Sequence, residues 1–515
     1  LDSLGPDVTS APVRMCPQHP EPVPLVHPLP VLKEALEKVD SILRQAMSAP
    51  GLAAMSAVVI HNDTMLWTGN YGKKNGSDPT SGPPNEYTIY RIASISKIFP
   101  VLMLYRLWEE GIVASLDDPL ERYASTFTIN NPLGMESASK QQTLVLRRMA
   151  SQLSGLPRRL RATSLLWRGS TQEALSLLKD DVLVADPGTR CHYSTLAFSL
   201  LAHVLAAHTA QGDYQRWVSE NLLEPLAMAD TGFDFTPSVR IRLAAGFYGS
   251  GRPAPLYDLG WYRPSGQMYS TSADLAKLAM ALLGSGSRQL LRPDAAKTLL
   301  APLLACPGTY FANETGTPWE FHAQRGYNVV RKDGDLDGYA ATFSLVPPLR
   351  LGLVLLLAGP RPPGPDLVAQ SYDVLLPALE RAFREAELSP APPPSARPFA
   401  GYFTFANLTF YEVRAGPEGE LRLRQFGPRL EALVPPAFRT LTLRHLRGRV
   451  FQLHVAREFP CALPLGDAWL SLEAQHGQLV NFYPLDAYGL SPGFDVPGLN
   501  TYRVLRLSRK PVFKT

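Results

Sequence analysis

The stretch that decides the fold is residues 91–111, "RIASISKIFPVLMLYRLWEEG". It places Ser94 three residues before Lys97, at the start of the largely apolar run 98–108. If this run is a helix, positions i and i+3 share a face, so the lysine amine would lie beside the serine hydroxyl. A neutral amine in that place can accept the hydroxyl proton, which makes the serine a candidate nucleophile.

The same spacing recurs at Ser137–Lys140 and Ser176–Lys179, so the flanking sequence has to separate the three pairs. Ser137 lies in the polar stretch "GMESASKQQ", and Ser176 lies in an ordinary amphipathic pattern. Only Ser94 heads a strongly apolar run. Burial there would lower the pKa of the lysine, and the N-terminus of the helix would offer N–H groups to a developing oxyanion.

Two later stretches carry further candidate residues. The segment 185–205, "ADPGTRCHYSTLAFSLLAHVL", places Tyr193-Ser194-Thr195 after a Pro-Gly turn and before another apolar helical pattern. The segment 331–348, "RKDGDLDGYAATFSLVPP", places Lys332-Asp333-Gly334 at the end of a strand pattern. Lys74-Asn75-Gly76 also fits Lys-x-Gly, but it precedes the serine and lies in a polar turn.

In this order the three elements resemble the Ser-x-x-Lys, Tyr-x-Asn and Lys/His-x-Gly motifs of class C serine β-lactamases, penicillin-binding D-alanyl-D-alanine peptidases and related esterases, and of eukaryotic β-lactamase-like proteins. The resemblance covers about residues 31–385 and implies an α+β fold, an antiparallel sheet flanked by helices. Three accessory segments support it: "ASQLSGLP" (150–157), "PLAMADTGF" (225–233) and "SGQMYSTSADLAKLAMALL" (265–283).

The resemblance also implies roles for the candidate residues. Ser94 would be acylated, Lys97 and Tyr193 would form the base, and Lys332 would hold substrate and lower the pKa of Tyr193. The oxyanion hole would be the backbone N–H groups of Ser94 and Asp335. No metal or organic cofactor is expected. The substrate-binding residues implied are Thr195, Lys332, Asp333, Gly334 and Asp335.

Three positions depart from the family pattern or from a regular helix. Thr195 replaces the asparagine of Tyr-x-Asn, and Asp333 replaces the hydroxyl residue between lysine and glycine. We expect Asp333 to neutralise Lys332 and to repel a substrate carboxylate, which disfavours penicillins. Pro100 lies inside the expected helix and predicts a kink in its second turn.

Neighbouring residues allow other interpretations of the same segments. Cys191 and His192 precede Tyr193 and suggest a Cys/His mechanism, although a packed or disulfide-bonded cysteine is the interpretation we favour. Asp335 and Asp337 suggest a metal site, but a short acidic cluster without histidines is more typical of a turn.

The sequence predicts four segments. Residues 1–30 are rich in proline and read as an extended leader, and residues 31–387 would form the catalytic domain. The proline-rich residues 388–398 predict a linker, and residues 399–515 alternate as expected for a C-terminal all-β accessory domain, such as a barrel.

Composition limits the compartment and the partners. A net charge of +4 over 515 residues gives no nucleic-acid signature, and the apolar run 351–358 is too short to span a membrane. Four cysteines allow zero, one or two disulfides: Cys16, Cys191, Cys306 and Cys461. Four sequons favour a secreted or luminal glycoprotein: Asn62, Asn75, Asn313 and Asn407. Because the chain starts at Leu1, we expect a removed targeting or anchoring segment.

The preferred hypothesis is a serine hydrolase that cleaves an amide or ester of a small or peptide-like acyl substrate through Ser94. A catalytically silent binding or scaffold protein with the same fold is the main alternative. A filament-forming or membrane-associated structural protein is the third, and a homo-oligomer is a further expectation.

Overall fold

The computed structural model describes residues 29–133, 144–285, 288–386, 395–455, 462–465, 468–471, 475–499 and 501–513. The chain divides into two compact units. The serine unit consists of residues 41–62 and 70–373, and the barrel unit consists of the described parts of 1–40, 63–69 and 374–515. Several sequence predictions fall outside the described residues, namely the leader 1–28, most of the linker 388–398, the pair Ser137–Lys140, Cys16 and Cys461.

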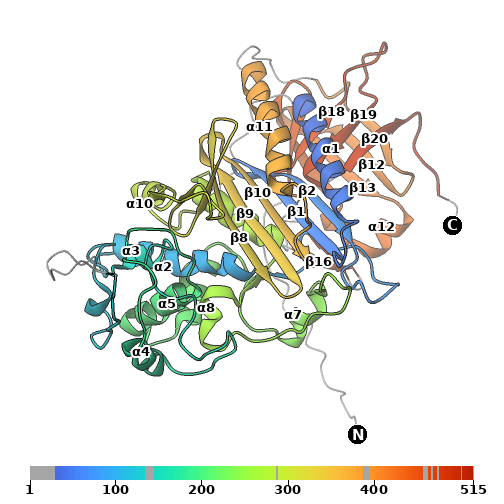
Figure 1. Ribbon diagram of the computed structural model, residues 1–515. Helices are drawn as coiled ribbons and strands as arrows, with labels where there is room; N and C mark the ends of the chain where they lie inside the picture. Colours follow the sequence, from blue (N-terminus) through green and yellow to red (C-terminus); the bar gives the residue numbers. More distant parts are fainter. Residues whose placement is uncertain are drawn as a thin grey trace, which may run out of the picture. The chain divides into compact units, whose positions relative to one another are not determined.

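An eight-stranded sheet in the order β2-β1-β10-β9-β8-β7-β6-β5 forms the centre of the fold (Figure 1). Every residue of β1, β9 and β10 is buried, because these strands are apolar on both faces and the sheet is covered on both. The predicted antiparallel sheet with flanking helices is therefore confirmed. Its strands are β1 Ala54–His61, β2 Thr64–Gly72, β5 Leu304–Ala305, β6 Glu314–Thr315, β7 Glu320–Gln324, β8 Tyr327–Leu336, β9 Tyr339–Val346 and β10 Leu351–Ala358, and β3 Tyr90–Arg91 pairs separately with β4 Tyr269–Ser270.

Strand β8 presents different residues to the two faces of the sheet. Because successive side chains of a strand point to opposite faces, Lys332 and Gly334 share one face while Arg331 and Asp333 share the other. The second face also carries Ser344 of β9, whose hydroxyl lies 2.7 Å from the hydroxyl of Tyr372 in the first turns of α11. The candidate site lies on the first face.

The helices of the serine unit include a correction to the sequence prediction. Ser94 lies in a 3-10 helix, η1 (Ala93–Lys97), and the α-helix α2 begins only at Ile98. Pro100 is therefore in the first turn of α2, where its missing N–H has no α-helical partner to lose, and the predicted kink stays a prediction. The helices are α1 Leu29–Ala46, α2 Ile98–Glu109, α3 Leu146–Met149, α4 Thr171–Lys179, α5 Thr195–Thr209, α6 Tyr214–Val218, α7 Pro237–Arg242, α8 Arg263–Gly266, α9 Ser272–Leu283, α10 Pro293–Leu299, α11 Leu367–Ala386 and α12 Pro428–Leu433.

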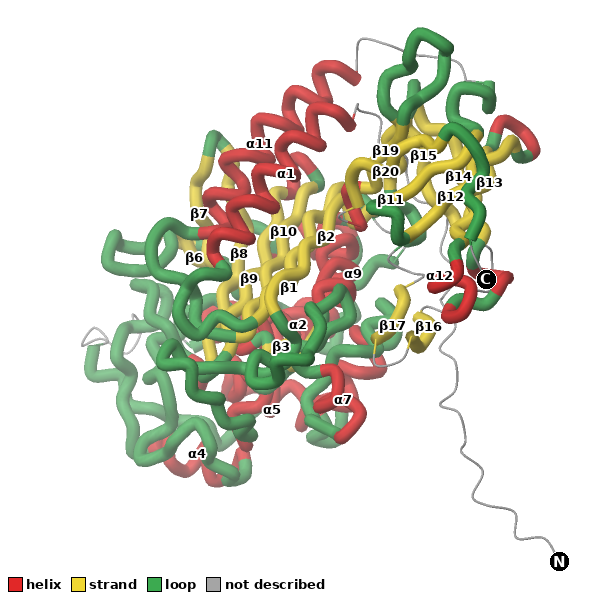
Figure 2. Tube along the Cα trace, turned by 90° about the vertical axis from the view of Figure 1, so that its right-hand side faces the viewer, coloured by secondary structure: helices red, strands yellow, loops and turns green. Residues whose placement is uncertain are grey.

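Eight strands of the barrel unit close into a barrel (Figure 2), which confirms the predicted C-terminal β domain. Aromatic side chains such as Phe403, Phe482 and Phe494 fill its core. Lys33 of α1, in the same unit, forms a 3.0 Å ion pair with the buried Asp495. The barrel strands are β11 Gly401–Phe405, β12 Thr409–Ala415, β13 Leu421–Phe426, β14 Thr440–Arg447, β15 Val450–His454, β18 Leu479–Phe482, β19 Gly493–Val496 and β20 Thr501–Leu507, and a separate pair is β16 Ala462–Leu465 with β17 Ala468–Ser471.

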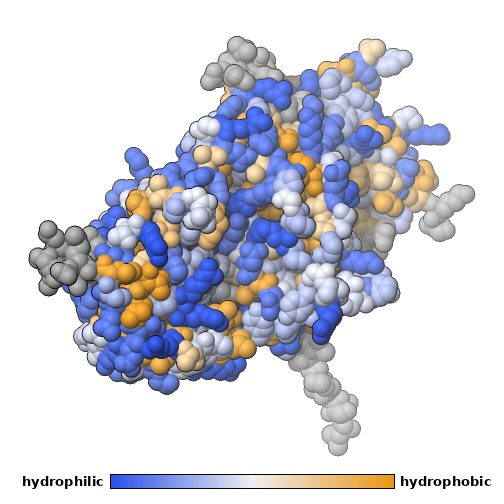
Figure 3. Space-filling view, in the orientation of Figure 1, coloured by the Kyte–Doolittle hydropathy of each residue, from blue (hydrophilic) through white to orange (hydrophobic). Residues whose placement is uncertain are grey.

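The exposed surface is mixed. Hydrophilic residues cover most of the face shown in Figure 3, and hydrophobic residues gather only in small patches. Among the described residues, no helix is both long enough and apolar enough to cross a membrane.

Candidate active site

Ser94 is presented by an uncommon backbone conformation. The preceding residue, Ala93, is buried and has φ of 48°, in the left-handed region that L-residues rarely adopt. Such strain costs on the order of 1–3 kcal/mol and persists only where the surroundings enforce it, which is a common feature of functional sites. The turn leaves the Ser94 side chain half-buried at the start of η1.

Two ionisable side chains donate hydrogen bonds to the Ser94 hydroxyl oxygen. The Lys97 amine lies 2.9 Å from Ser94 Oγ, and the Tyr193 hydroxyl lies 2.6 Å from it. Lys97 is only 1% exposed and donates a second bond, of 3.0 Å, to the carbonyl of Ser265. The sequence segments 91–111 and 185–205 thus meet at one oxygen atom.

The electrostatic environment lowers the pKa of both groups. Burial lowers the pKa of Lys97, and the charge of Lys332 adds to this effect. Burial alone would raise the pKa of Tyr193, but the charges of Lys332 and Lys97 outweigh it, so the pKa of the phenol is lowered. Both groups can therefore give up their protons below their ordinary range near pH 10.

Lys332 also reaches this site and has a partner that sequence reasoning missed. Its amine lies 5.4 Å from the centre of the Tyr193 ring and 3.1 Å from a carboxylate oxygen of Glu320, the first residue of β7. The other carboxylate oxygen accepts the N–H of Asp333 at 2.9 Å. Burial opposes the charge of Lys332, but Glu320 and Tyr193 outweigh it and raise the pKa of the amine.

The backbone of β8 lies directly against the serine. A side chain at Gly334 would come within 2.7 Å of the Ser94 nitrogen, so this close approach requires glycine. Strand β7 begins at Glu320, which pairs with Arg331 of β8, so β7 does not pair with the residues of β8 that follow Arg331. On that edge, the N–H of Asp333 donates instead to the Glu320 side chain. The N–H of Asp335 points to the same edge, because N–H directions alternate along a strand. The two predicted oxyanion donors, Ser94 and Asp335, thus flank Gly334.

The comparison with known families agrees with this arrangement. The model of the beta-lactamase family matches residues 39–376. The chain belongs to the β-lactamase family. Its members include β-lactamases and D-alanine carboxypeptidases, which are serine hydrolases, and the resemblance drawn from the sequence is confirmed.

Three known proteins illustrate the relationship. A human protein named beta-lactamase-like 1 is 90% identical over 97% of this chain and 100% of its own length. A β-lactamase/D-alanine carboxypeptidase from Yersinia pestis shares the fold with a TM-score of 0.54 at 22% identity, over 66% of this chain and 98% of that one. An octameric penicillin-binding protein homologue from Pyrococcus abyssi has a TM-score of 0.57 at 19% identity, over 88% and 96% of the two chains.

Asp333, where the chain departs from the family motif, does not neutralise Lys332 as expected. Its carboxylate lies on the opposite face of β8, 3.0 Å from Arg331 and 2.6 Å from the hydroxyl of Thr342, and Arg361 lies 4.0 Å away. Burial opposes its charge, but Arg331 and Arg361 hold its pKa below the usual range. Only the backbone carbonyl of Asp333 contacts the Lys332 amine, at 2.9 Å.

Thr195, the other departure, makes no side-chain hydrogen bond within the described ranges. Thr195 is the first residue of α5. The family's asparagine would contact the lysine amine, whereas here the Lys97 amine donates to the carbonyl of Ser265. Gln152 fixes the neighbouring segment, because its side-chain oxygen accepts the N–H of Ser194 at 2.7 Å. The sequence identified the segments 150–157 and 265–283, but it did not predict that Gln152 orients the Ser194 segment or that the Ser265 carbonyl binds the Lys97 amine.

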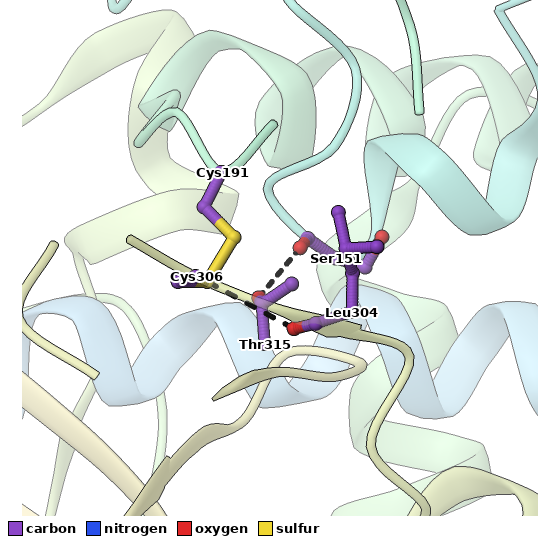
Figure 4. The surroundings of a disulfide bond; sticks show 5 residues. All are labelled: Ser151, Cys191, Leu304, Cys306 and Thr315. Atoms are coloured by element: carbon purple, nitrogen blue, oxygen red, sulfur yellow. Dashed lines mark hydrogen bonds between the residues drawn. A yellow bond between two sulfur atoms is a disulfide. The ribbon is translucent and has the colours of Figure 1, made fainter. Parts of the chain in front are cut away.

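A disulfide between Cys191 and Cys306 ties an aromatic loop to the Tyr193 segment (Figure 4). In the loop, Tyr310 stacks on Phe311 with ring centres 4.3 Å apart, and Phe311 meets the Tyr193 ring at 5.6 Å. The side chain of Phe311 is nevertheless 51% exposed. The disulfide settles the alternative of a Cys/His mechanism, because Cys191 has no free thiol.

The four sequon asparagines are spread over both units. Asn75, Asn313 and Asn407 are exposed, and Asn62 is half-buried in the turn between β1 and β2, where its side-chain oxygen accepts a bond from Arg350. Glycosylation of these positions stays a prediction.

Proposed function

We propose that the chain is a serine hydrolase that cleaves an amide or ester through an acyl-enzyme on Ser94. The observation that carries this proposal is the pair of bonds from Lys97 and Tyr193 to the Ser94 oxygen, 2.9 and 2.6 Å long. Both donors are buried groups with lowered pKa values, so either of them, once deprotonated, can take the serine proton at a pH below its ordinary range.

In the proposed reaction, Ser94 Oγ attacks the substrate carbonyl carbon while its proton passes to the Lys97–Tyr193 pair. The N–H groups of Ser94 and Asp335 stabilise the oxyanion of the tetrahedral intermediate. Tyr193 then protonates the leaving nitrogen or oxygen, and the bond to the leaving group breaks. Water then attacks the carbonyl carbon of the acyl-enzyme while the Lys97–Tyr193 pair accepts its proton. The ester bond to Ser94 Oγ breaks, the pair returns the proton to Oγ, and the carboxylic acid product leaves.

A fluorophosphonate probe read by intact mass tests the nucleophile. The wild type should gain one adduct, Ser94→Ala should gain none, and Lys97→Ala should react far more slowly because the serine proton loses its acceptor. Ser176→Ala is the matched control. It carries the same Ser-x-x-Lys spacing to Lys179, but both side chains are exposed on α4. Equal labelling of wild type and Ser94→Ala would exclude Ser94.

The competing proposal is a binding or scaffold protein that has kept the fold. The free side chain of Thr195 supports it, because the family's asparagine at this place contacts both substrate and lysine. Restoring the motif separates the two proposals. If the chain is an enzyme, Thr195→Asn should change the ratio of kcat/KM values between two substrates. If the chain is catalytically silent, the probe should label neither the wild type nor Thr195→Asn.

For location and assembly, we propose a secreted or luminal glycoprotein. The exposed asparagines at 75, 313 and 407 support the first point. We also propose a homo-oligomer. The Pyrococcus abyssi homologue is octameric, and light scattering of this chain would test the proposal directly.

A further inference from the structure

Only part of the environment of Tyr193 is open to solvent. Lys97 and Lys332 lie 5.1 and 5.4 Å from the centre of its ring, but each of them is 1% exposed. Phe311 and Arg158 also lie beside the ring, at 5.6 Å between ring centres and at 5.9 Å from the guanidinium carbon, and both are exposed. Arg158 and Phe311 are therefore neighbours of Tyr193 that a substrate can contact from solvent.

The position of Arg158 relative to the site is fixed by its backbone. Its carbonyl accepts the N–H of Leu196 at 3.0 Å, and the carbonyl of Pro157 accepts the hydroxyl of Ser194 at 2.7 Å. Both bonds join residues 157–158 to the first turn of α5, directly after Tyr193. The backbone that carries Arg158 is thus tied to the same helix start as Tyr193.

The charge of Arg158 has no partner within the described part of the chain. No carboxylate there forms an ion pair with it, whereas Arg331, Arg242 and Arg263 each have one. Its charge nevertheless acts on the site, because it helps to lower the pKa of His192 and opposes the rise in the pKa of Tyr310. A guanidinium whose backbone is fixed beside reactive groups, and which has no counter-ion among the described residues, is suited to bind an anion of the substrate.

We infer that Arg158 is a specificity-determining residue that selects substrates carrying an anionic group, a carboxylate in the simplest case, next to an apolar portion that contacts Phe311. This inference rests on the proposed function and deepens it. The partners are complementary: the planar guanidinium can bind a carboxylate through two bonds, and the exposed ring offers an apolar surface to the adjoining methylene or aromatic group.

Matched ester pairs test the inference. In one pair the acyl group differs, phenyl pentanoate against the phenyl monoester of glutaric acid, and in the other the leaving group differs, phenyl acetate against 3-carboxyphenyl acetate. The wild type should hydrolyse the anionic member of at least one pair with the higher kcat/KM. Arg158→Gln should lower that value about tenfold, since a charge-assisted bond at an exposed site is lost, and should change the neutral member by less than about twofold.

Two further variants separate a specific role from a general one. Arg158→Lys should retain part of the preference, because it keeps the charge but loses the bidentate geometry. Arg159→Gln is the matched control, since Arg159 is also exposed and its charge acts on Tyr262. It should behave as wild type.

The outcomes for the inference and for the proposed function are distinguishable. If neutral esters are hydrolysed and Ser94 is labelled, but neither pair shows a preference that Arg158→Gln removes, the inference is wrong and the proposed function stands. If no ester is hydrolysed and Ser94 takes no label, both are wrong. Equal losses for neutral and anionic esters in Arg158→Gln would also overturn the inference, because they would indicate a structural role.

Discussion

Replacing Glu320 by glutamine should destabilise the serine unit strongly. The Glu320 carboxylate and the Lys332 amine are 3.1 Å apart and only 3% and 1% exposed, so the substitution leaves a buried lysine without its counter-ion. Breaking a buried ion pair from one side costs about 3–5 kcal/mol. Glutamine keeps one acceptor oxygen for the two donors that the carboxylate now accepts, Lys332 and the N–H of Asp333. We therefore expect a loss of about 3 kcal/mol in the free energy of unfolding at pH 7, the lower end of that range.

The loss should shrink as the pH rises, and the sign follows from linkage. Glu320 is the main influence that raises the pKa of Lys332 against burial, so without it burial should lower that pKa below the unfolded value. Between the lowered pKa and about 10.4 the unfolded chain then binds more protons than the folded one, and the stability of the variant increases with pH. In the wild type the pKa of Lys332 is raised, so its contribution to the free energy of unfolding stays intact until the pH exceeds the pKa of lysine in the unfolded chain.

Urea unfolding followed by tryptophan fluorescence at pH 7 and pH 10 measures both effects. Glu314→Gln is the control. It removes the same carboxylate from the neighbouring strand β6, where within the described residues Glu314 has no ion pair, and it should change stability by less than about 0.5 kcal/mol. A loss below about 1 kcal/mol for Glu320→Gln at pH 7, or a loss that grows toward pH 10, would refute the reasoning.

Four shorter predictions concern the reaction and the processing of the chain. Because the pKa values of Lys97 and Tyr193 are lowered, labelling of Ser94 should rise with pH and level off before pH 10, and a rate that keeps rising beyond that point contradicts the assignment. Because the Asp333 carboxylate lies on the face of β8 away from Ser94, it gives no reason to disfavour penicillins, and Asp333→Thr should leave the rate of Ser94 labelling close to that of wild type; a large gain would contradict this placement. Cys191→Ser should slow labelling about tenfold or more by releasing the aromatic loop, and a wild-type rate would exclude that role. Expressed from its full gene in mammalian cells, the protein should lose mass on glycosidase treatment, and unchanged mobility would contradict the proposed glycosylation.

The reaction centre was predictable because its chemistry lies in short local motifs. Ser94 and Lys97 are neighbours on one turn, Tyr193 lies just before the apolar helix α5, and Lys332 lies within β8, which the sequence pattern expected to end there. Three such motifs in family order were enough to identify segments that the fold brings together around Ser94 and Tyr193. The barrel was predictable for a similar reason, because alternating residues and closely spaced turns are local signals.

Glu320 could not be predicted, because nothing near it in the sequence marks it. It stands in "TPWEFHAQ", a strand start without polar spacing or a motif, and its importance comes only from the place where β7 begins relative to β8. Ser265 and Gln152 are similar cases. One acts through its backbone carbonyl and the other orients a loop, and neither role requires a recognisable residue pattern.

The error about Asp333 was avoidable from the sequence. The segment around Lys332 was already recognised as a strand, and in a strand adjacent side chains point to opposite faces. Lys332 and Asp333 therefore could not both face Ser94. The expectation that Asp333 neutralises Lys332 treated the two charges as neighbours in one site, whereas the contact between these residues is from the amine to the backbone carbonyl of Asp333.

The register of β8 therefore determines the charge of the site more than any single residue does. Pairing of Lys332 with Phe343 and of Gly334 with Ala341 places the lysine and the glycine on the Ser94 face, while Asp333 lies among arginines on the other. A shift of one residue would exchange the two faces, bringing a carboxylate to the serine and a side chain into the space that Gly334 leaves open. Because Glu320 accepts the Asp333 N–H and the Lys332 amine together, the residue that neutralises the lysine also holds the strand in the register that a developing oxyanion requires.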